Sequence, residues 1–436
     1  MTGRFDISED RCLFPNPRSP LAITKKTLPE EMARNAWQEW ERSHRPLLDR
    51  ASLKIVGCSF RRALKQRLER TSRHLALAQV FRARSKPGKA FTTRLDPCHL
   101  RQIVPGLAAL WDAQTSNWKE FLNVFTTDLY SFAKIEGSRL TALETDLSDC
   151  HSGGRTATRV RLGENELWYY KPRSGRKERL WHELLEKLNS AGFEPPFLIP
   201  RFHLRGDHHW MQAVKHRAPR DVTSRRRLAH QAGTILYLAY VFRAVDLHPA
   251  NFAIHDKYLV LVDCETLLHP ETRLPARFRE TEKGLFRTGM LAGGRNAPRF
   301  IAAIDASAGE IAEGFASIHA FLKRYGGKIG MQRWIARMRH EPVRLVLRPS
   351  IYYDRLLTRA LERELVYGGS PCQILWEYIS DGLTSDSRKR QEIGQLLAGD
   401  IPLFSGRAAA TRFPLSEQDF RQCVDSLLVS GDEKVR

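Results

Sequence analysis

The sequence predicts an α+β fold, because two regions with helical spacing of apolar residues enclose a central region with strand-like alternation. In the basic N-terminal region, apolar residues recur at helical intervals in residues 28–50 and 59–85. From Asp149 the pattern changes to alternating polar and apolar residues separated by short turns. Helical spacing then returns and continues towards the C-terminus. We therefore expect a mixed core with helical regions at both ends.

Composition and charge narrow the class of partner. The chain has 436 residues, enough for two or three domains, and a formal net charge of +21. This charge indicates either a solvated Arg-rich surface or a surface that attracts a polyanion, such as a nucleotide or an acidic peptide. The sequence has no zinc-finger pattern, no basic-leucine-zipper pattern and no aromatic–basic RNA-binding signature. Nucleic acid is therefore not an expected partner.

Cysteine usage and the absence of targeting signals favour a cytoplasmic protein. The seven cysteines are scattered and never stand in C-x-x-C spacing, which argues against a disulfide framework and a Cys-rich zinc site. The N-terminal stretch MTGRFDISEDRC contains acidic residues and no apolar run, unlike a signal peptide. No window approaches about 18 uninterrupted apolar residues, so we expect no membrane span.

The most informative stretch runs from Asp246 to Pro270 and reads DLHPANFAIHDKYLVLVDCETLLHP. Protein kinases separate a catalytic Asp from a metal-binding Asn by four residues and place a metal-binding Asp one strand later. Asp246, Asn251 and Asp263 follow this order, and an apolar, hairpin-like run precedes Asp263. His248 follows the first Asp instead of preceding it, which is closer to the lipid-kinase variant. The stretch predicts a kinase-like phosphoryl-transfer site.

A strand-borne lysine upstream supplies the cation that such a site needs. Two β-rich runs meet at Gly163-Glu164-Asn165, predicting a hairpin whose second strand ends at Lys171. A helix over residues 176–189 follows, and a kinase small lobe presents its phosphate-binding lysine in this context. Glu183, or alternatively Glu178, is expected to form an ion pair with this lysine.

Further elements complete the predicted core. We expect a second hairpin in residues 197–216, a buried helix over 225–243 that leads into Asp246, and later helices over 311–324, over 331–339 and from Ser350 onwards. Residues 284–298 are Gly-rich and are either an activation-segment analogue or a loop. Residues 151–155 are either a cover for phosphates or a plain turn, and no P-loop pattern occurs.

Each residue type fits a role in phosphoryl transfer. Asp246 can accept the proton of an attacking hydroxyl, and Lys171 can hold phosphates of ATP. His248 can orient Asp246 or contact the γ-phosphate, although it can equally be a packed loop histidine. Hard oxygen ligands suited to Mg²⁺ are supplied by Asn251, Asp263 and Glu265.

Seven segments, in order between Trp118 and Tyr353, resemble the dehydratase domain of type II lanthipeptide synthetases. They read WKEFLNVFTTDL, SDCHSGGRT, YYKPRSG, AVDLHPAN, VDCETLLHP, RTGML and VRLVLRPSIYY. The resemblance covers a little over half of the chain and implies an elaborated, two-lobed kinase-like fold. It also implies ATP-dependent phosphorylation of Ser and Thr in a precursor peptide, then elimination of phosphate to dehydroalanine and dehydrobutyrine.

The resemblance assigns roles to two groups of residues. Arg344 and Ser350 stand where the family has an Arg and a Thr that act in phosphate elimination. A guanidinium suits a phosphate leaving group, although Arg344 can instead be part of a structural ion pair. The positions that match the phosphorylation site are Lys171, Asp246, His248, Asn251, Asp263 and Glu265.

These assignments divide the chain into three regions. Residues 1–125 form a basic helical region, 126–360 the kinase-like dehydratase core, and 361–436 a helical region. Within the core, a small lobe is expected over about 150–217 and a large lobe over about 221–360.

The sequence departs from the family in several places. Ser350 replaces Thr but keeps the hydroxyl, and Ala292 stands where a Pro is usual. The first 115 residues match weakly, so leader-peptide recognition does not transfer. The synthetases continue into a zinc-bearing cyclase whose Cys and His ligands are missing here, so cyclisation would need a separate protein or proceed unaided.

Two alternatives remain open. The chain could be a peptide or small-molecule kinase without elimination, or a catalytically inactive module that binds a leader peptide. The complete set of Lys171, Asp246, Asn251 and Asp263 counts against the inactive module.

Overall fold

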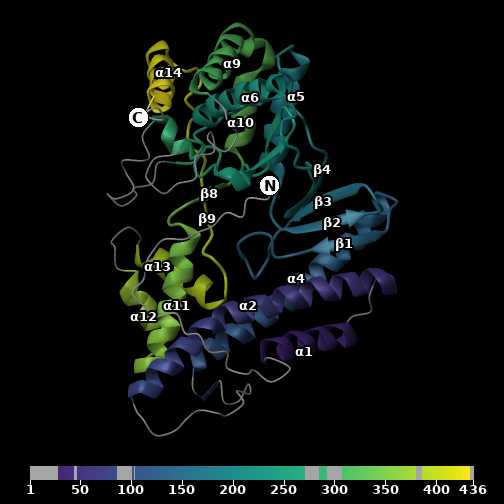
Figure 1. Ribbon diagram of the computed structural model, residues 1–436, viewed down its shortest axis with the longest axis vertical. Helices are drawn as coiled ribbons and strands as arrows, with labels where there is room; N and C mark the ends of the chain where they lie inside the picture. The colour runs from purple at the N-terminus through teal and green to yellow at the C-terminus, as the bar shows by residue number, and fades with distance from the viewer. Residues whose placement is uncertain are drawn as a thin grey trace.

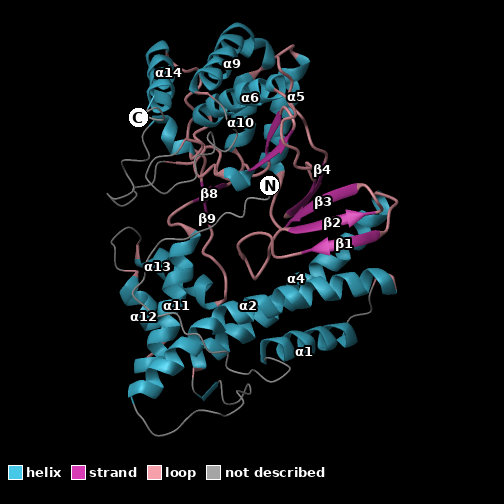
Figure 2. Ribbon diagram, in the orientation of Figure 1, coloured by secondary structure: helices cyan, strands magenta, loops and turns pink. Residues whose placement is uncertain are grey.

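The computed structural model describes residues 28–43, 47–85, 101–102, 104–270, 284–291, 307–379 and 385–432. The fold is mixed and mostly helical with small antiparallel sheets, which confirms the predicted α+β class (Figures 1 and 2). Part of the Gly-rich segment, residues 292–298, lies outside the described residues, as does Ala292. In the described part of the chain, no helix is long and apolar enough to cross a membrane.

Three helices form a base beneath the largest sheet (Figure 1). They are α1 (Leu28–Ser43), α2 (Arg50–Ser85) and α4 (Pro105–Ile135). Buried aromatic and aliphatic residues recur along α4 at helical spacing, which gives it a continuous apolar face. Pro105 stands in the first turn of α4, where a missing N–H costs nothing.

The largest sheet has five antiparallel strands in the order β1-β2-β3-β5-β4. Both predicted hairpins are confirmed in it. The strand bounds are Leu140–Glu144 (β1), Thr158–Leu162 (β2), Glu166–Lys171 (β3), Phe202–Arg205 (β4) and His208–Gln212 (β5).

Side-chain alternation gives this sheet two different faces. Trp168 and Tyr170 of β3 are buried with Trp210 of β5 against α4, where the Trp210 and Phe132 rings stack with centroids 4.0 Å apart. Lys171 belongs to the opposite alternation of β3 and lines a cavity. The aromatic face therefore fixes the direction in which the lysine points.

A second apolar core joins five helices and a hairpin, drawn in the upper part of Figure 1. Gly233 and Gly314 allow two of these helices to approach closely, because a Cβ on Gly233 would lie 1.9 Å from the Ile311 carbonyl oxygen. The elements are α5 (Arg176–Ser190), α6 (Val222–Val241), β6 (Phe252–His255), β7 (Tyr258–Leu261), α9 (Ala308–Ile329), α10 (Met331–Arg339) and α14 (Glu417–Asp432).

The C-terminal part of the chain contributes to both regions. Strand β8 (Val343–Leu345) pairs with β9 (Phe404–Gly406), a pairing that the sequence did not indicate. Helix α14 packs against α9, whereas α11 packs against α2 and α12. The bounds of the remaining helices are Ser350–Tyr367 (α11), Pro371–Tyr378 (α12) and Asp386–Leu397 (α13). The described residues after Leu361 are therefore mostly helical, but they do not form one separate layer.

Candidate functional site

A cavity of about 670 Å³ lies between the five-stranded sheet, the loop after α6 and strand β8. Its volume is in the range of small-molecule sites. Seven of the nine predicted site residues line it: Lys171, Asp246, His248, Asn251, Asp263, Glu265 and Arg344. The other two, Glu183 and Ser350, are not among the lining residues.

The Asp246 loop has a backbone conformation that its neighbours enforce. Asp246 has a φ of 59°, a left-handed value that is uncommon for a non-glycine residue but more frequent for Asp and Asn. The Leu247 N–H donates to the Thr288 carbonyl oxygen at 2.8 Å. A Cβ on Gly289 would lie 2.7 Å from the Leu247 nitrogen, so the segment Gly284–Leu291 supports this loop at contact distance. Such enforced strain is frequent at functional sites.

The surroundings of Asp246 make its carboxylate a stronger base than an ordinary aspartate. The side chain opens to solvent at the cavity, yet desolvation by the cavity walls raises its pKa above the usual value. His248 and Arg344 lower the pKa and partly offset this effect, whereas Asp263 raises it further. A carboxylate with a raised pKa is better suited to accept a proton than an ordinary surface Asp.

Asn251 is anchored by the short 3-10 turn η1 (Pro249–Asn251). Its side-chain oxygen accepts a hydrogen bond from the His248 N–H at 2.9 Å, and its own N–H donates to the His248 carbonyl oxygen at 2.9 Å. The Asn251 carbonyl oxygen accepts from the Val262 N–H at 2.8 Å, next to Asp263. Asn251 precedes strand β6 and Asp263 follows strand β7, so the hairpin places both residues at its open end.

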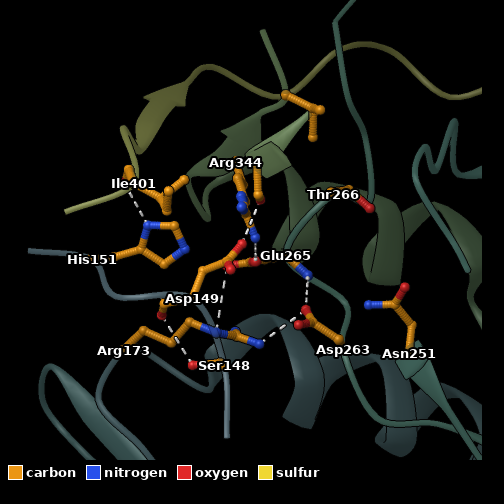
Figure 3. A network of polar contacts seen from close by, with 12 residues as sticks. Ser148, Asp149, His151, Arg173, Asn251, Asp263, Glu265, Thr266, Arg344 and Ile401 are labelled. Carbon is orange, nitrogen blue, oxygen red and sulfur yellow. Dashed lines mark hydrogen bonds and ion pairs between the residues drawn. The ribbon is translucent and has the colours of Figure 1, made fainter. Parts of the chain in front are cut away.

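Arg173 connects the acidic residues of the site (Figure 3). Its guanidinium donates to Asp263 Oδ1 at 2.9 Å and lies 3.4 Å from Glu265 Oε2. It also donates to Glu178, which is fully buried. The Arg173 carbonyl oxygen is held by His209 Nδ1 at 2.9 Å. Sequence reasoning did not single out Arg173, although its position two residues after Lys171 was a signal.

The charge balance keeps Asp263 ionised. Burial alone would raise its pKa, but Arg173 and Lys171 outweigh burial and hold the pKa well below its usual range. Lys171 Nζ also donates to the Val262 carbonyl oxygen, so the lysine and the aspartate are adjacent at the end of β7. An ionised Asp263 and the side-chain oxygen of Asn251, which both line the cavity, are donors that suit a hard cation.

The donor set fits Mg²⁺ that enters together with a phosphate ligand. Among the described residues, no three His, Cys, Asp or Glu side chains are grouped so that they could hold a metal ion. Mg²⁺ in phosphoryl-transfer proteins usually takes one or two protein oxygens and receives the others from phosphates and water. Asp263 and Asn251 can supply those protein oxygens, and Arg173 holds one oxygen of Asp263 as Arg344 holds Glu265.

Glu183 does not have the predicted partner. Its carboxylate accepts from Arg179 at 2.8 Å and from Arg337 at 3.1 Å, and the structure records no contact between it and Lys171. The alternative residue, Glu178, is the buried acid of α5 and pairs with Arg173. The acid of this helix that faces the site is therefore Glu178.

Arg344 lines the cavity, and Ser350 contacts a lining residue. Arg344 pairs with Glu265 through its side chain, and its N–H donates to the Glu265 carbonyl oxygen at 2.9 Å. Ser350 begins α11, and its hydroxyl donates to Asp149, which lines the cavity. Both predicted elimination residues thus contact acidic residues of the cavity wall.

The two glycine N–H groups in the turn at residues 151–155 are bound within the protein. Gly153 and Gly154 have positive φ values of 86° and 71°, which orient successive N–H groups to the same side. Both N–H groups donate to the Asp400 carboxylate, at 2.7 and 2.8 Å. The anion held by this turn is therefore a side chain of the protein.

Three buried histidines predict a loss of stability in mild acid. Burial lowers the pKa of His182 to about 3 and the pKa values of His209 and His269 to about 4, from an ordinary value of 6.5. The unfolded chain binds these protons below pH 6.5, whereas the folded chain stays neutral at these positions. The free energy of unfolding should therefore fall between pH 6.5 and 4, by up to about 1.4 kcal/mol per pH unit for each histidine.

Thermal unfolding midpoints measured across this range test that expectation. Asp263 and Glu178 also have lowered pKa values, but they reduce stability only as the pH falls below their ordinary values of 3.8 and 4.5. The range from pH 6.5 to 4.5 therefore reports on the histidines. His182→Gln should reduce the fall of the unfolding midpoint with decreasing pH by about one third, because it removes one of the three histidines. The exposed control His340→Gln should leave this fall unchanged. A midpoint that stays constant from pH 6.5 to 4.5 would contradict the prediction.

A comparison with known families identifies the chain at family level. The family described as "Domain of unknown function (DUF4135)" matches residues 103–308 and 286–407. No curated protein matches the chain. This domain is found in lanthipeptide synthetases, although the family description names no function. Because the matched ranges span more than half of the 436 residues, the chain belongs to the DUF4135 family.

Proposed function

We propose that the protein is a lanthipeptide-type dehydratase that uses ATP to phosphorylate Ser and Thr of a precursor peptide and then eliminates phosphate. The observation that carries this proposal is one cavity lined by Asp246, Asn251, Asp263 and Lys171. These are the residue types that phosphoryl transfer needs as proton acceptor, metal ligands and phosphate-binding cation. The elimination step rests on the sequence resemblance and on Arg344.

A kinase-like, two-lobed arrangement is part of the proposal. Its support is the order of elements around the cavity: an antiparallel sheet with Lys171 on β3, helix α5 with a buried acid, and the Asp246 loop after α6. In this arrangement the sheet side would cover the nucleotide phosphates, and the Asp246 side would receive the peptide.

In the first step, the hydroxyl oxygen of a peptide Ser or Thr attacks the γ-phosphorus of ATP. The bond between that phosphorus and the β–γ bridging oxygen breaks, and ADP leaves. Asp246 takes the hydroxyl proton, for which its raised pKa suits it. Lys171 holds phosphate oxygens, and Asn251 and Asp263 would hold Mg²⁺, which neutralises charge on the phosphates.

In the second step, a base removes the α-proton of the phosphorylated residue, and the Cβ–O bond breaks. Phosphate leaves with the former hydroxyl oxygen, and a Cα–Cβ double bond forms. Arg344 can stabilise the growing charge on the leaving phosphate by paired N–H donors. To do so, its guanidinium would have to share or release Glu265.

The cellular setting is proposed with the reaction. We propose a cytoplasmic protein whose partner is a ribosomally made precursor peptide, with leader and core. A separate cyclase would act on the dehydrated product. The net charge of +21 would attract acidic leader peptides and phosphorylated intermediates.

One incubation separates the candidate functions. The purified protein is mixed with ATP, Mg²⁺ and the precursor peptide encoded beside its gene, and the peptide mass is measured. Loss of one water per modified Ser or Thr is the result expected for a dehydratase. A stable gain of phosphate would instead identify a kinase without elimination, and an unchanged mass would leave a peptide-binding module.

A further inference from the structure

The segment from Asp149 to Arg155 forms one wall of the cavity. It connects β1 to β2, and Asp149, His151 and Arg155 are lining residues. The backbone hydrogen bonds recorded within the segment join His151 and Arg155, with N···O distances of 3.1 and 3.0 Å. Figure 3 shows Asp149 and His151 on the Arg344 side of Asp263, with Asn251 on the other side. The position of the segment must therefore be set by contacts with other parts of the chain.

The first set of contacts comes from the turn after α13. Asp400 is 5% exposed, and its carboxylate accepts the N–H groups of Gly153 and Gly154. The Ile401 N–H donates to the Cys150 carbonyl oxygen at 2.8 Å, and the Ile401 carbonyl oxygen is 2.7 Å from His151 Nδ1. Four consecutive hydrogen bonds thus attach the segment to a part of the chain about 250 residues later.

The second set of contacts comes from α2. Arg67 is 5% exposed and donates to the Gly154 carbonyl oxygen at 2.9 Å and to Asp146 Oδ1 at 2.7 and 3.0 Å. A Cβ on Gly154 would lie 3.1 Å from Asn117 Cβ and 3.3 Å from Arg67 Nη1, so a larger residue would displace the segment. The segment is therefore held on both sides by buried charged groups.

Two buried charges are a costly way to hold a surface turn. An ionised carboxylate and a guanidinium lose hydration when buried, and well-packed apolar residues often give equal or greater stability. What charged groups add is a defined geometry, because each hydrogen bond fixes one backbone atom of the segment. This geometry matters most where the segment meets reacting groups.

We propose that Asp400 and Arg67 are positioning residues that dock the segment Asp149–Arg155 beside Arg344 and Ser350 and thereby support phosphate elimination more than phosphorylation. The proposal rests on the two-step function proposed above. The Asp149 carboxylate accepts a hydrogen bond from the Ser350 hydroxyl. Displacement of the segment would therefore move the part of the cavity wall that contacts the predicted elimination residues. Asp246 and Asn251 are held by the η1 turn and by Gly284–Leu291, which do not include this segment.

Two half-reactions measured separately test this proposal. Phosphorylation is followed with ATP and precursor peptide, and elimination with a synthetic phosphopeptide plus ADP and Mg²⁺. For Asp400→Ala we expect elimination to slow on the order of 100-fold, because small misplacements near reacting groups have effects of this size. We expect phosphorylation to change less than about threefold, so phosphopeptide accumulates. Asp400→Asn, which keeps the side-chain shape and one acceptor oxygen, should recover part of the elimination rate.

Hydrogen exchange provides a readout that does not depend on activity. Amides of residues 146–156 should exchange faster in Asp400→Ala and Arg67→Lys than in the unaltered protein. The matched control is Asp354→Ala, at an exposed aspartate on α11, and it should change neither the exchange nor the two rates. Arg67→Lys, which keeps the charge, serves as the second variant if Asp400→Ala does not fold.

Two results would show that Asp400 does not position this segment for elimination. Unchanged exchange in this segment, or an equal fall of both rates together with a lower unfolding temperature, would overturn the positioning role. If the unaltered protein neither phosphorylates nor eliminates, the proposed function fails and the positioning of elimination fails with it. The exchange result would then still show whether Asp400 docks the segment.

Discussion

Asp246→Asn is expected to lower the rate of peptide phosphorylation by about 10²- to 10⁴-fold. Asn cannot accept the hydroxyl proton, but it has nearly the same shape. Asn also tolerates the left-handed conformation of this position, where φ is 59°, so the loop should keep its geometry. Initial rates of phosphopeptide and dehydrated peptide formation, measured by mass spectrometry, check this result.

The matched control is Asp256→Asn in the turn between β6 and β7. Asp256 also has a positive φ, of 57°, but does not line the cavity. Its substitution should leave the rates within about twofold, as is usual for positions away from reacting groups. If Asp246→Asn kept the normal rate of dehydration, Asp246 would not be the proton acceptor.

Arg344→Ala is expected to accumulate phosphopeptide. Loss of one donor group that stabilises developing charge commonly slows a step by about 10²- to 10³-fold, so elimination should fall by this amount. Phosphorylation should continue, because Arg344 is not among the predicted phosphate-holding or metal-binding residues. Arg344→Lys should restore only part of the elimination rate, since an ammonium group cannot bind phosphate with two parallel N–H donors.

The loss of the ion pair with Glu265 must be separated from a loss of chemistry. Arg337→Ala removes another arginine–glutamate pair, with Glu183, outside the cavity, and should leave both half-reactions unchanged. Unfolding temperatures of Arg344→Ala and Arg337→Ala should then show whether Arg344 has a larger structural role. If Arg344→Ala accumulated no more phosphopeptide than the unaltered protein, Arg344 would have no role in elimination.

Local patterns predicted the elements around the cavity well. Period-two alternation identified the first hairpin of the sheet, a Gly-containing turn identified the second, and helical spacing identified α5, α6, α9 and α10. Asp246, Asn251 and Asp263, whose spacing predicted a phosphoryl-transfer site, line one cavity, because a short hairpin returns the chain to the same end. These predictions depend on contacts close in sequence.

Contacts distant in sequence were not predictable in the same way. The pairing of β8 with β9 and the attachment of residues 150–154 to Asp400 and Arg67 join parts of the chain with no local signal of contact. The predicted ion pair between Glu183 and Lys171 was wrong for a more specific reason. Glu178 shares the buried face of α5 with Trp181, three residues later, whereas Glu183 pairs with Arg179 one turn earlier on the helix surface. An acid on the apolar face was the better candidate for a buried ion pair.

The origin of the oxygen atoms in released phosphate tests the central claim most directly. The protein is incubated with ATP, Mg²⁺ and precursor peptide in heavy-oxygen water, and both phosphate and peptide are analysed by mass spectrometry. Phosphorylation followed by elimination predicts a peptide that loses water and a phosphate that carries the peptide's hydroxyl oxygen and no solvent oxygen. Phosphate that contains solvent oxygen, together with a peptide of unchanged mass, would mean that the cavity only hydrolyses ATP and would contradict the proposed function.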